Sequence, residues 1–165
     1  MREVFDKLAF QFLIKWEGGY SNDPDDFGGE TKYGISHRAY PHLNIKALTL
    51  EQAQDIYYAD YWLGNRSDEL PIMIAMLLFD FSVNSGKLRA VKELQKCVNR
   101  TTEENLLVDG INGDVTISAV KKCDSKLLAY MYIQARIRFL SGLKNDKFFK
   151  GWINRVLALV DYVGL

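Results

Sequence analysis

Residues 4–35 have the sequence VFDKLAFQFLIKWEGGYSNDPDDFGGETKYGI, in which an apolar helical pattern gives way to a polar, turn-rich one. Gly18 and Gly19 are expected to end the helix, because glycine leaves the helical conformation at little cost. Residues 18–35 contain no long apolar run, and we expect there at most a minor β element, either a small hairpin or an irregular flap. The apolar side chains before Glu17 recur every three or four residues, as on one face of an amphipathic helix: Val4, Phe5, Leu8, Ala9, Phe12, Leu13 and Trp16.

Helical spacing continues through the rest of the chain. Residues 49–52, Thr-Leu-Glu-Gln, have the form of a capping box that opens a helix, and Pro71 suits the first turn of a strongly apolar one. Alternating strand patterns are scarce, so the sequence predicts a mainly α fold. The predicted helices cover about 49–62, 71–81, 88–98, a short segment capped by Asp114 or Thr116, 125–141 and 152–163.

The charges of the chain balance, with 21 basic and 21 acidic residues. Nucleic-acid binding depends on clustered Lys and Arg, so neutrality argues against a nucleic-acid partner and against polybasic attachment to a membrane. The longest apolar run, residues 70–79, is too short to span a bilayer, and we expect no stable membrane insertion. Residues 1–7 carry charges where the apolar core of a signal peptide would begin, so we expect synthesis in the cytoplasm without a signal peptide.

Cysteine and histidine are sparse. Cys97 and Cys123 lie 26 residues apart without a CxxC spacing. Two buried free thiols are the prediction, although the sequence does not exclude a disulfide between them. His37 and His42 are the only histidines, no cluster of metal ligands stands out, and we expect neither a metal nor a cofactor.

Glu17 follows an apolar helix and stands next to Trp16. If its carboxyl group is partly buried against the indole, desolvation disfavours the charged form and raises the pKa of Glu17. A carboxylic acid that stays protonated near neutral pH can donate a proton to a glycosidic oxygen. Position alone does not separate this hypothesis from a solvated glutamate at a helix end.

The longer stretch around Glu17 is more specific. EGGY at residues 17–20 is followed by Pro24, Asp26, GG at residues 28–29, and T-x-Y-G-I at residues 31–35. This string resembles the motif of the glycoside hydrolase 108 lysozymes, a group also described as secretion activators. The resemblance implies a lysozyme-like, two-lobed helical fold and peptidoglycan as the substrate.

Three later segments extend the resemblance over nearly the whole chain. Residues 80–86 are similar to the family's D-x-x-V-N-x-G segment, residues 109–116 to its DGxxG…T segment, and residues 149–155 to its F-x-GW-x-NR box. The last two segments are similar to the peptidoglycan-binding half of this family. The resemblance therefore implies a lysozyme-like catalytic region at residues 1–90 and a peptidoglycan-binding helical region at residues 91–165, packed against it.

The catalytic roles that the resemblance implies fall on three residues. Glu17 is the glutamate of EGGY and would be the general acid. In phage-type lysozymes of the wider superfamily, eight residues separate the catalytic glutamate from an aspartate, and five residues separate that aspartate from a threonine. Here Asp26 keeps the first spacing to Glu17, whereas only four residues separate Asp26 from Thr31. Asp26 is therefore the predicted second carboxylate, with Asp25 left as an alternative because both also fit a solvated turn. The separation of the two carboxylates would decide between retention and inversion, and the sequence does not give it.

Further side chains are candidates for the sugar cleft. Tyr20 and Tyr33 would bind sugar hydroxyls or faces, with simple packing as the alternative. Asp80 and Asn84 lie four residues apart, so one helical face would present both to the cleft, unless Asp80 braces the local backbone. Trp152 and Arg155 are expected mainly to brace the C-terminal half, with contact to ligand as the alternative.

The expected activity is that of an N-acetylmuramidase, which cleaves the β-1,4 bond between N-acetylmuramic acid and N-acetylglucosamine. The expected partners are peptidoglycan glycan strands and, for release to the periplasm and cell wall, a holin-like export partner of the kind prophages use. A lytic transglycosylase is an alternative, which a second carboxylate that manages water disfavours. The alternatives from another class are a non-catalytic peptidoglycan-binding protein and a secretion regulator with a lysozyme-like fold.

Overall fold

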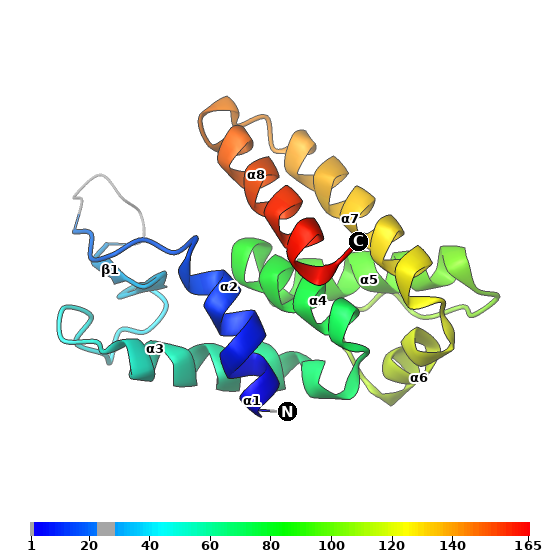
Figure 1. The fold of residues 1–165 in the computed structure, drawn as a ribbon, viewed down its shortest axis with the longest axis horizontal. Helices are drawn as coiled ribbons and strands as arrows, with labels where there is room; N and C mark the ends of the chain where they lie inside the picture. Colours follow the sequence, from blue (N-terminus) through cyan, green and yellow to red (C-terminus); the bar gives the residue numbers. More distant parts are fainter. Residues whose placement is uncertain (1, 23–28) are drawn as a thin grey trace. The chain divides into compact units, whose positions relative to one another are not determined.

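The computed structural model describes residues 2–22 and 29–165, which divide into two compact units, Met1–Asp60 and Tyr61–Leu165. Both units consist mainly of helices, and the described strands are two short ones in the first unit (Figure 1). The prediction of a mainly α fold with a minor β element near residues 18–35 is confirmed. The predicted division at residue 90 concerns function and stays a proposal.

The first unit begins with one helical segment made of α1 (Arg2–Val4), a π-helical turn η1 (Phe5–Ala9) and α2 (Phe10–Ile14). Phe5 and Phe10 are fully buried on its apolar face, as the spacing predicts. Their rings pack against Tyr58 and Tyr57, with centroid distances of 5.1 and 6.3 Å. This aromatic contact holds the first helix against the second one of the unit.

The second helix of the unit is α3 (Leu50–Ile56), which continues as η2 (Tyr57–Trp62) to the predicted end. Its first turn has the predicted capping box: Thr49 Oγ1 accepts a hydrogen bond from Gln52 N at 3.1 Å, and Thr49 N donates to Gln52 Oε1 at 2.9 Å. Two amides without a helical partner are thereby satisfied, which is why this helix begins at Leu50.

A small hairpin joins the two helices of the first unit. Strands β1 (Thr31–Lys32) and β2 (Ile35–Ser36) pair antiparallel, with Thr31 opposite Ser36. The turn residues Tyr33 and Gly34 both have positive φ, 52° and 77°, which is the conformation of the tight turns that fit the twist of a hairpin. Ile35 is buried and anchors the hairpin to the core of the unit.

The second unit is built around α4 (Ile72–Ser85), whose residues 74–82 are all buried. The helices α5 (Lys87–Thr101), α7 (Ser125–Gly142) and α8 (Asp146–Val163) pack on it. Figure 1 shows α7 and α8 as an antiparallel pair joined by a short turn. An uninterrupted apolar helix is stable only when other helices cover it on several sides, and this arrangement does so.

Smaller elements complete the second unit, namely η3 (Leu63–Asn65), η4 (Ser67–Glu69) and α6 (Asp114–Lys122). The predicted cap of α6 is wrong, because its N-cap is Gly113 and Asp114 is its first helical residue. The carboxylate of Asp114 pairs with Arg66 at 2.6 Å instead of capping the helix. Pro71 likewise precedes α4 as its N-cap and does not lie in the first turn.

Both cysteines are free thiols, as predicted. Cys97 is buried and Cys123 partly so, which corrects the expectation that both are buried. Burial raises the pKa of the Cys97 thiol to about 11, so this thiol is not activated. Among the described residues, no helix has the length and apolar character needed to cross a membrane.

Candidate active site around Glu17

Glu17 lies just beyond the end of α2, where the chain still follows the helix. Its backbone N donates to Leu13 O at 3.2 Å, and Trp16 N donates to the same carbonyl at 2.9 Å. Leu13 is fully buried, while the Glu17 side chain is half-buried. The core therefore holds the backbone that carries Glu17, and the side chain keeps partial access to solvent.

The hairpin turn approaches the Glu17 side chain closely at Gly34. A Cβ placed on Gly34 would lie 2.9 Å from Glu17 Cδ and would also collide with Glu17 Oε2 and with the Tyr57 hydroxyl. Only glycine leaves this space open, and it also tolerates the positive φ of 77° at this position. Glu17, Gly34 and Tyr57 thus meet at one point, although they come from the segment after α2, the hairpin and η2.

Tyr57 connects this point to the core of the first unit. Its side chain is only 1% exposed, and its hydroxyl donates to the backbone oxygen of Tyr33 at 3.0 Å. The phenol therefore fixes the hairpin turn at the place where the turn contacts Glu17. Sequence reasoning missed Tyr57, because an aromatic residue in an amphipathic helix indicates only a core position.

Thr31 lies in β1, beside the segment that follows Glu17. Its backbone exchanges two hydrogen bonds of 2.8 Å with Ser21, and its hydroxyl donates to Gly29 O at 3.1 Å. This pairing places β1 alongside Ser21, in the segment that follows Glu17. A catalytic role for the hydroxyl stays a prediction.

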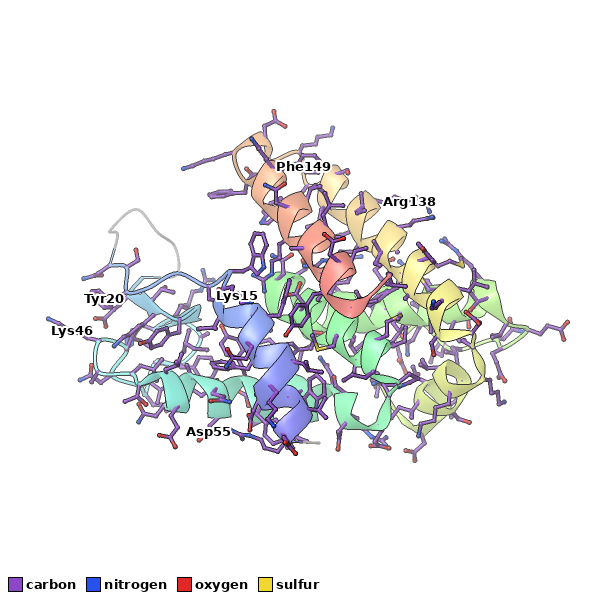
Figure 2. The ribbon with its side chains drawn as sticks, viewed as in Figure 1. Lys15, Tyr20, Lys46, Asp55, Arg138 and Phe149 are labelled. Carbon is purple, nitrogen blue, oxygen red and sulfur yellow. The ribbon has the colours of Figure 1, made fainter. Side chains whose placement is uncertain are left out.

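The two predicted sugar-binding tyrosines remain accessible. Tyr20 is 45% exposed and extends from the chain leading to the hairpin, where its hydroxyl donates to Glu30 Oε1 at 2.6 Å (Figure 2). This hydrogen bond raises the pKa of Tyr20. Tyr33 is half-buried, with the Lys32 ammonium 5.4 Å from its ring centroid. Glu30, which the sequence did not single out, orients Tyr20, and contact of either tyrosine with sugar stays a prediction.

Asp26, the predicted second carboxylate, and its alternative Asp25 lie outside the described residues. Their roles stay predictions. Among the residues that the structure describes, no three metal-ligating side chains gather at one place.

Asp80 belongs to the second unit and is only 1% exposed. Its Oδ2 lies 2.7 Å from Arg136 Nη1, and its Oδ1 accepts hydrogen bonds from Arg155 Nε at 2.9 Å and Nη2 at 2.7 Å. Burial alone would raise the pKa of Asp80, but the charges of Arg136 and Arg155 outweigh it and hold this pKa below its ordinary value.

The burial of Asp80 and its two arginine partners favour the alternative that Asp80 braces the structure, and its contact with substrate stays a prediction. Arg155 is buried and braces α8 on α4, which agrees with the bracing role expected for it. Trp152 is half-buried against Phe148, with a centroid distance of 6.1 Å. Asn84 is half-buried and accepts a hydrogen bond from Ser85 Oγ at 3.0 Å, so its contact with sugar stays a prediction.

Comparisons with known proteins agree with this architecture. The family model described as "Glycosyl hydrolase 108" matches residues 10–86, and the model described as "Predicted Peptidoglycan domain" matches residues 89–157. Among solved structures, the chain is similar to SagA of Brucella abortus, with 34% identity and a TM-score of 0.84 over 99% of this chain and 95% of that one. No curated protein matches the chain.

Proposed function

Because the chain belongs to the glycosyl hydrolase 108 family and carries a peptidoglycan domain, it is a peptidoglycan hydrolase, and we propose that it is an N-acetylmuramidase with Glu17 as general acid. The bond cleaved would be the β-1,4 bond between N-acetylmuramic acid and N-acetylglucosamine. The observation that carries the proposal is the placement of the Glu17 carboxylate against Gly34 and Tyr57, at the end of a helix anchored in the core.

In this mechanism, Glu17 donates its proton to the oxygen of the leaving sugar as the glycosidic bond breaks. Positive charge then develops on the sugar ring, and a second carboxylate stabilises it or activates water. We assign this second role to Asp26. Tyr57 acts as a positioning residue, because its hydrogen bond to Tyr33 holds the hairpin turn that limits where the Glu17 side chain lies.

In this proposal, residues 1–90 carry out catalysis and residues 91–165 bind the peptidoglycan of the cell wall. The match of a peptidoglycan domain to residues 89–157 supports this division. Action at the periplasmic cell wall after release by a holin-like partner is part of the same proposal. Locating a tagged chain in cells with and without a co-expressed holin tests it.

The loss of turbidity of purified peptidoglycan tests the acid role. Glu17→Gln keeps the shape of the side chain but removes the proton donor, so the rate should fall by at least about 100-fold. Glu51→Gln, at an exposed position in the first turn of α3, makes the same change in charge and should leave the rate within a factor of two. A Glu17→Gln variant that keeps most of the parent rate, with an unchanged far-UV spectrum, would exclude Glu17 as the acid.

A further inference from the structure

The chain as a whole is neutral, but its two units have net charges of opposite sign. Residues 1–60 contain 6 basic and 10 acidic residues, whereas residues 61–165 contain 15 basic and 11 acidic ones. The second unit is therefore a net cation, and it includes the peptidoglycan-binding region. A net charge of this sign favours an anionic partner.

Part of this positive charge gathers on neighbouring faces of α5 and α7. Arg89, Lys96 and Arg100 follow one another on α5 at intervals of seven and four residues, which places them along one helical face. Together with Arg138 of α7 they line a hollow of about 330 Å³, which we call the α5–α7 groove. The other residues lining this groove are Glu93, Ala135 and Phe139.

The groove holds more positive charge than its own carboxylate neutralises. Glu93 is its one acidic residue, and it pairs with Lys96 at 2.9 Å and with Arg89 at 3.2 Å. Arg100 and Arg138 are exposed, and neither forms an ion pair with any residue in the described part of the chain. Figure 2 shows Arg138 projecting outward from α7. Two guanidinium groups are thus available to a ligand.

Two further observations concern the cations of the groove. Burial raises the pKa of the Cys97 thiol, and the charges of Arg100, Lys96 and Arg138 oppose this rise, whereas the charge of Glu93 adds to it. The Phe139 ring forms a wall of the groove and holds the Arg89 guanidinium 4.9 Å from its centroid. The groove is therefore a hollow, positively charged surface formed by two packed helices.

We propose that the α5–α7 groove binds the free carboxylates of the stem peptides of peptidoglycan, an inference that rests on the proposed function. The acetylated sugars of the glycan are neutral, and in a strand that bears stem peptides the negative charge lies on the carboxylates of those peptides. Guanidinium groups match carboxylates in a bidentate geometry, which a single ammonium cannot do. The groove would then hold the peptides of a strand whose glycan is cleaved at Glu17.

Pelleting of the full chain with purified peptidoglycan tests this assignment. Every protein carries Glu17→Gln, so that binding is measured without cleavage. Adding Arg100→Gln and Arg138→Gln removes both unpaired guanidinium groups, and the apparent Kd should rise about tenfold, with a weaker dependence on salt. The matched control, Lys126→Gln with Lys150→Gln, removes two exposed charges of α7 and α8 outside the groove and should bind within twofold of the parent.

A second arm uses the unaltered groove and changes the ligand. The Glu17→Gln parent should bind peptidoglycan whose carboxylates have been converted to amides about tenfold more weakly than it binds native peptidoglycan. The groove variant should bind the amidated and the native peptidoglycan equally well. Equal binding of native and amidated wall by the parent would overturn the proposal, as would equal losses in the groove variant and the lysine control. Duplex DNA that competes with the wall at equal charge would indicate a general anion surface and also overturn it. Failure of the muramidase proposal would show separately, as absence of cleavage by the chain that retains Glu17.

Discussion

Replacing Gly34 by alanine tests the geometry of the acid site directly. The added Cβ would collide with Glu17 Oε2 and with the Tyr57 hydroxyl, and Tyr57 is buried and cannot retreat. The Glu17 side chain is the more mobile neighbour, so we expect its carboxylate to move by about an ångström. A displacement of this size in a reacting group lowers the rate by about 100-fold.

The change also affects stability, but by much less. A residue with a Cβ at φ 77° destabilises the fold by about 1–2 kcal/mol, which leaves most molecules folded at room temperature. The loss of rate should therefore greatly exceed the loss expected from unfolding. Initial rates on purified peptidoglycan and urea unfolding of the same samples give the two quantities.

Two glycines serve as controls for Gly34→Ala. Gly29 has a similar φ of 65°, but no described atom lies within 4 Å of its added Cβ, so Gly29→Ala reports the conformational effect without the collision. Gly19 has open space among the described atoms and no positive φ, so Gly19→Ala should change little. A Gly34→Ala variant that keeps the parent rate, or a Gly29→Ala variant that loses as much activity as Gly34→Ala, would show that the collision at Gly34 does not position Glu17.

Three further predictions concern Tyr57, Asp80 and the second carboxylate. Tyr57→Phe removes the hydrogen bond to Tyr33 but keeps the packing, so the unfolding free energy should fall by about 1 kcal/mol and kcat should fall while KM changes little; steady-state kinetics on soluble glycan fragments tests this. Asp80→Ala leaves two arginines buried without their partner and should lower the unfolding free energy by about 3–5 kcal/mol. Since the pKa of Asp80 is lowered in the folded state, its stabilisation is present above the ordinary value near 4 and is lost as the pH falls below it. Urea titrations from pH 5 to about 2 should therefore show a decline in stability that is smaller in Asp80→Ala than in the parent, because Glu69 and Asp109, whose pKa values are also lowered, remain in both. Asp26→Asn should reduce turnover more than Asp25→Asn, and the opposite order in turbidity assays would reverse our assignment of the second carboxylate.

The helices could be predicted from the sequence because their determinants are local. The capping box at Thr49 involves bonds between residues three apart, and it opens the helix where the pattern indicates. The hairpin was foreseen only as a minor element, because its turn at Tyr33 and Gly34 is shorter than the window over which periodicity can be judged.

The surroundings of Glu17 could not be predicted in the same way. Tyr57 reaches the hairpin from a helix 24 residues further along the chain, and only folding brings them together. The surroundings of Asp80 could not be predicted for a related reason. Its spacing to Asn84 indicates a shared helical face, but its burial depends on Arg136 and Arg155, and Arg155 is 75 residues distant. The motif identified Asp80 as important without showing whether it contacts ligand or core.

Mass spectrometry of the muropeptides released from purified peptidoglycan tests the central claim most directly, because the chemical end of each product records which bond broke and how. The parent chain should release products that end in reducing N-acetylmuramic acid, and Glu17→Gln should release almost none. Products that end in reducing N-acetylglucosamine or in anhydro sugars, or the same products from Glu17→Gln, would contradict a muramidase that uses Glu17 as its acid.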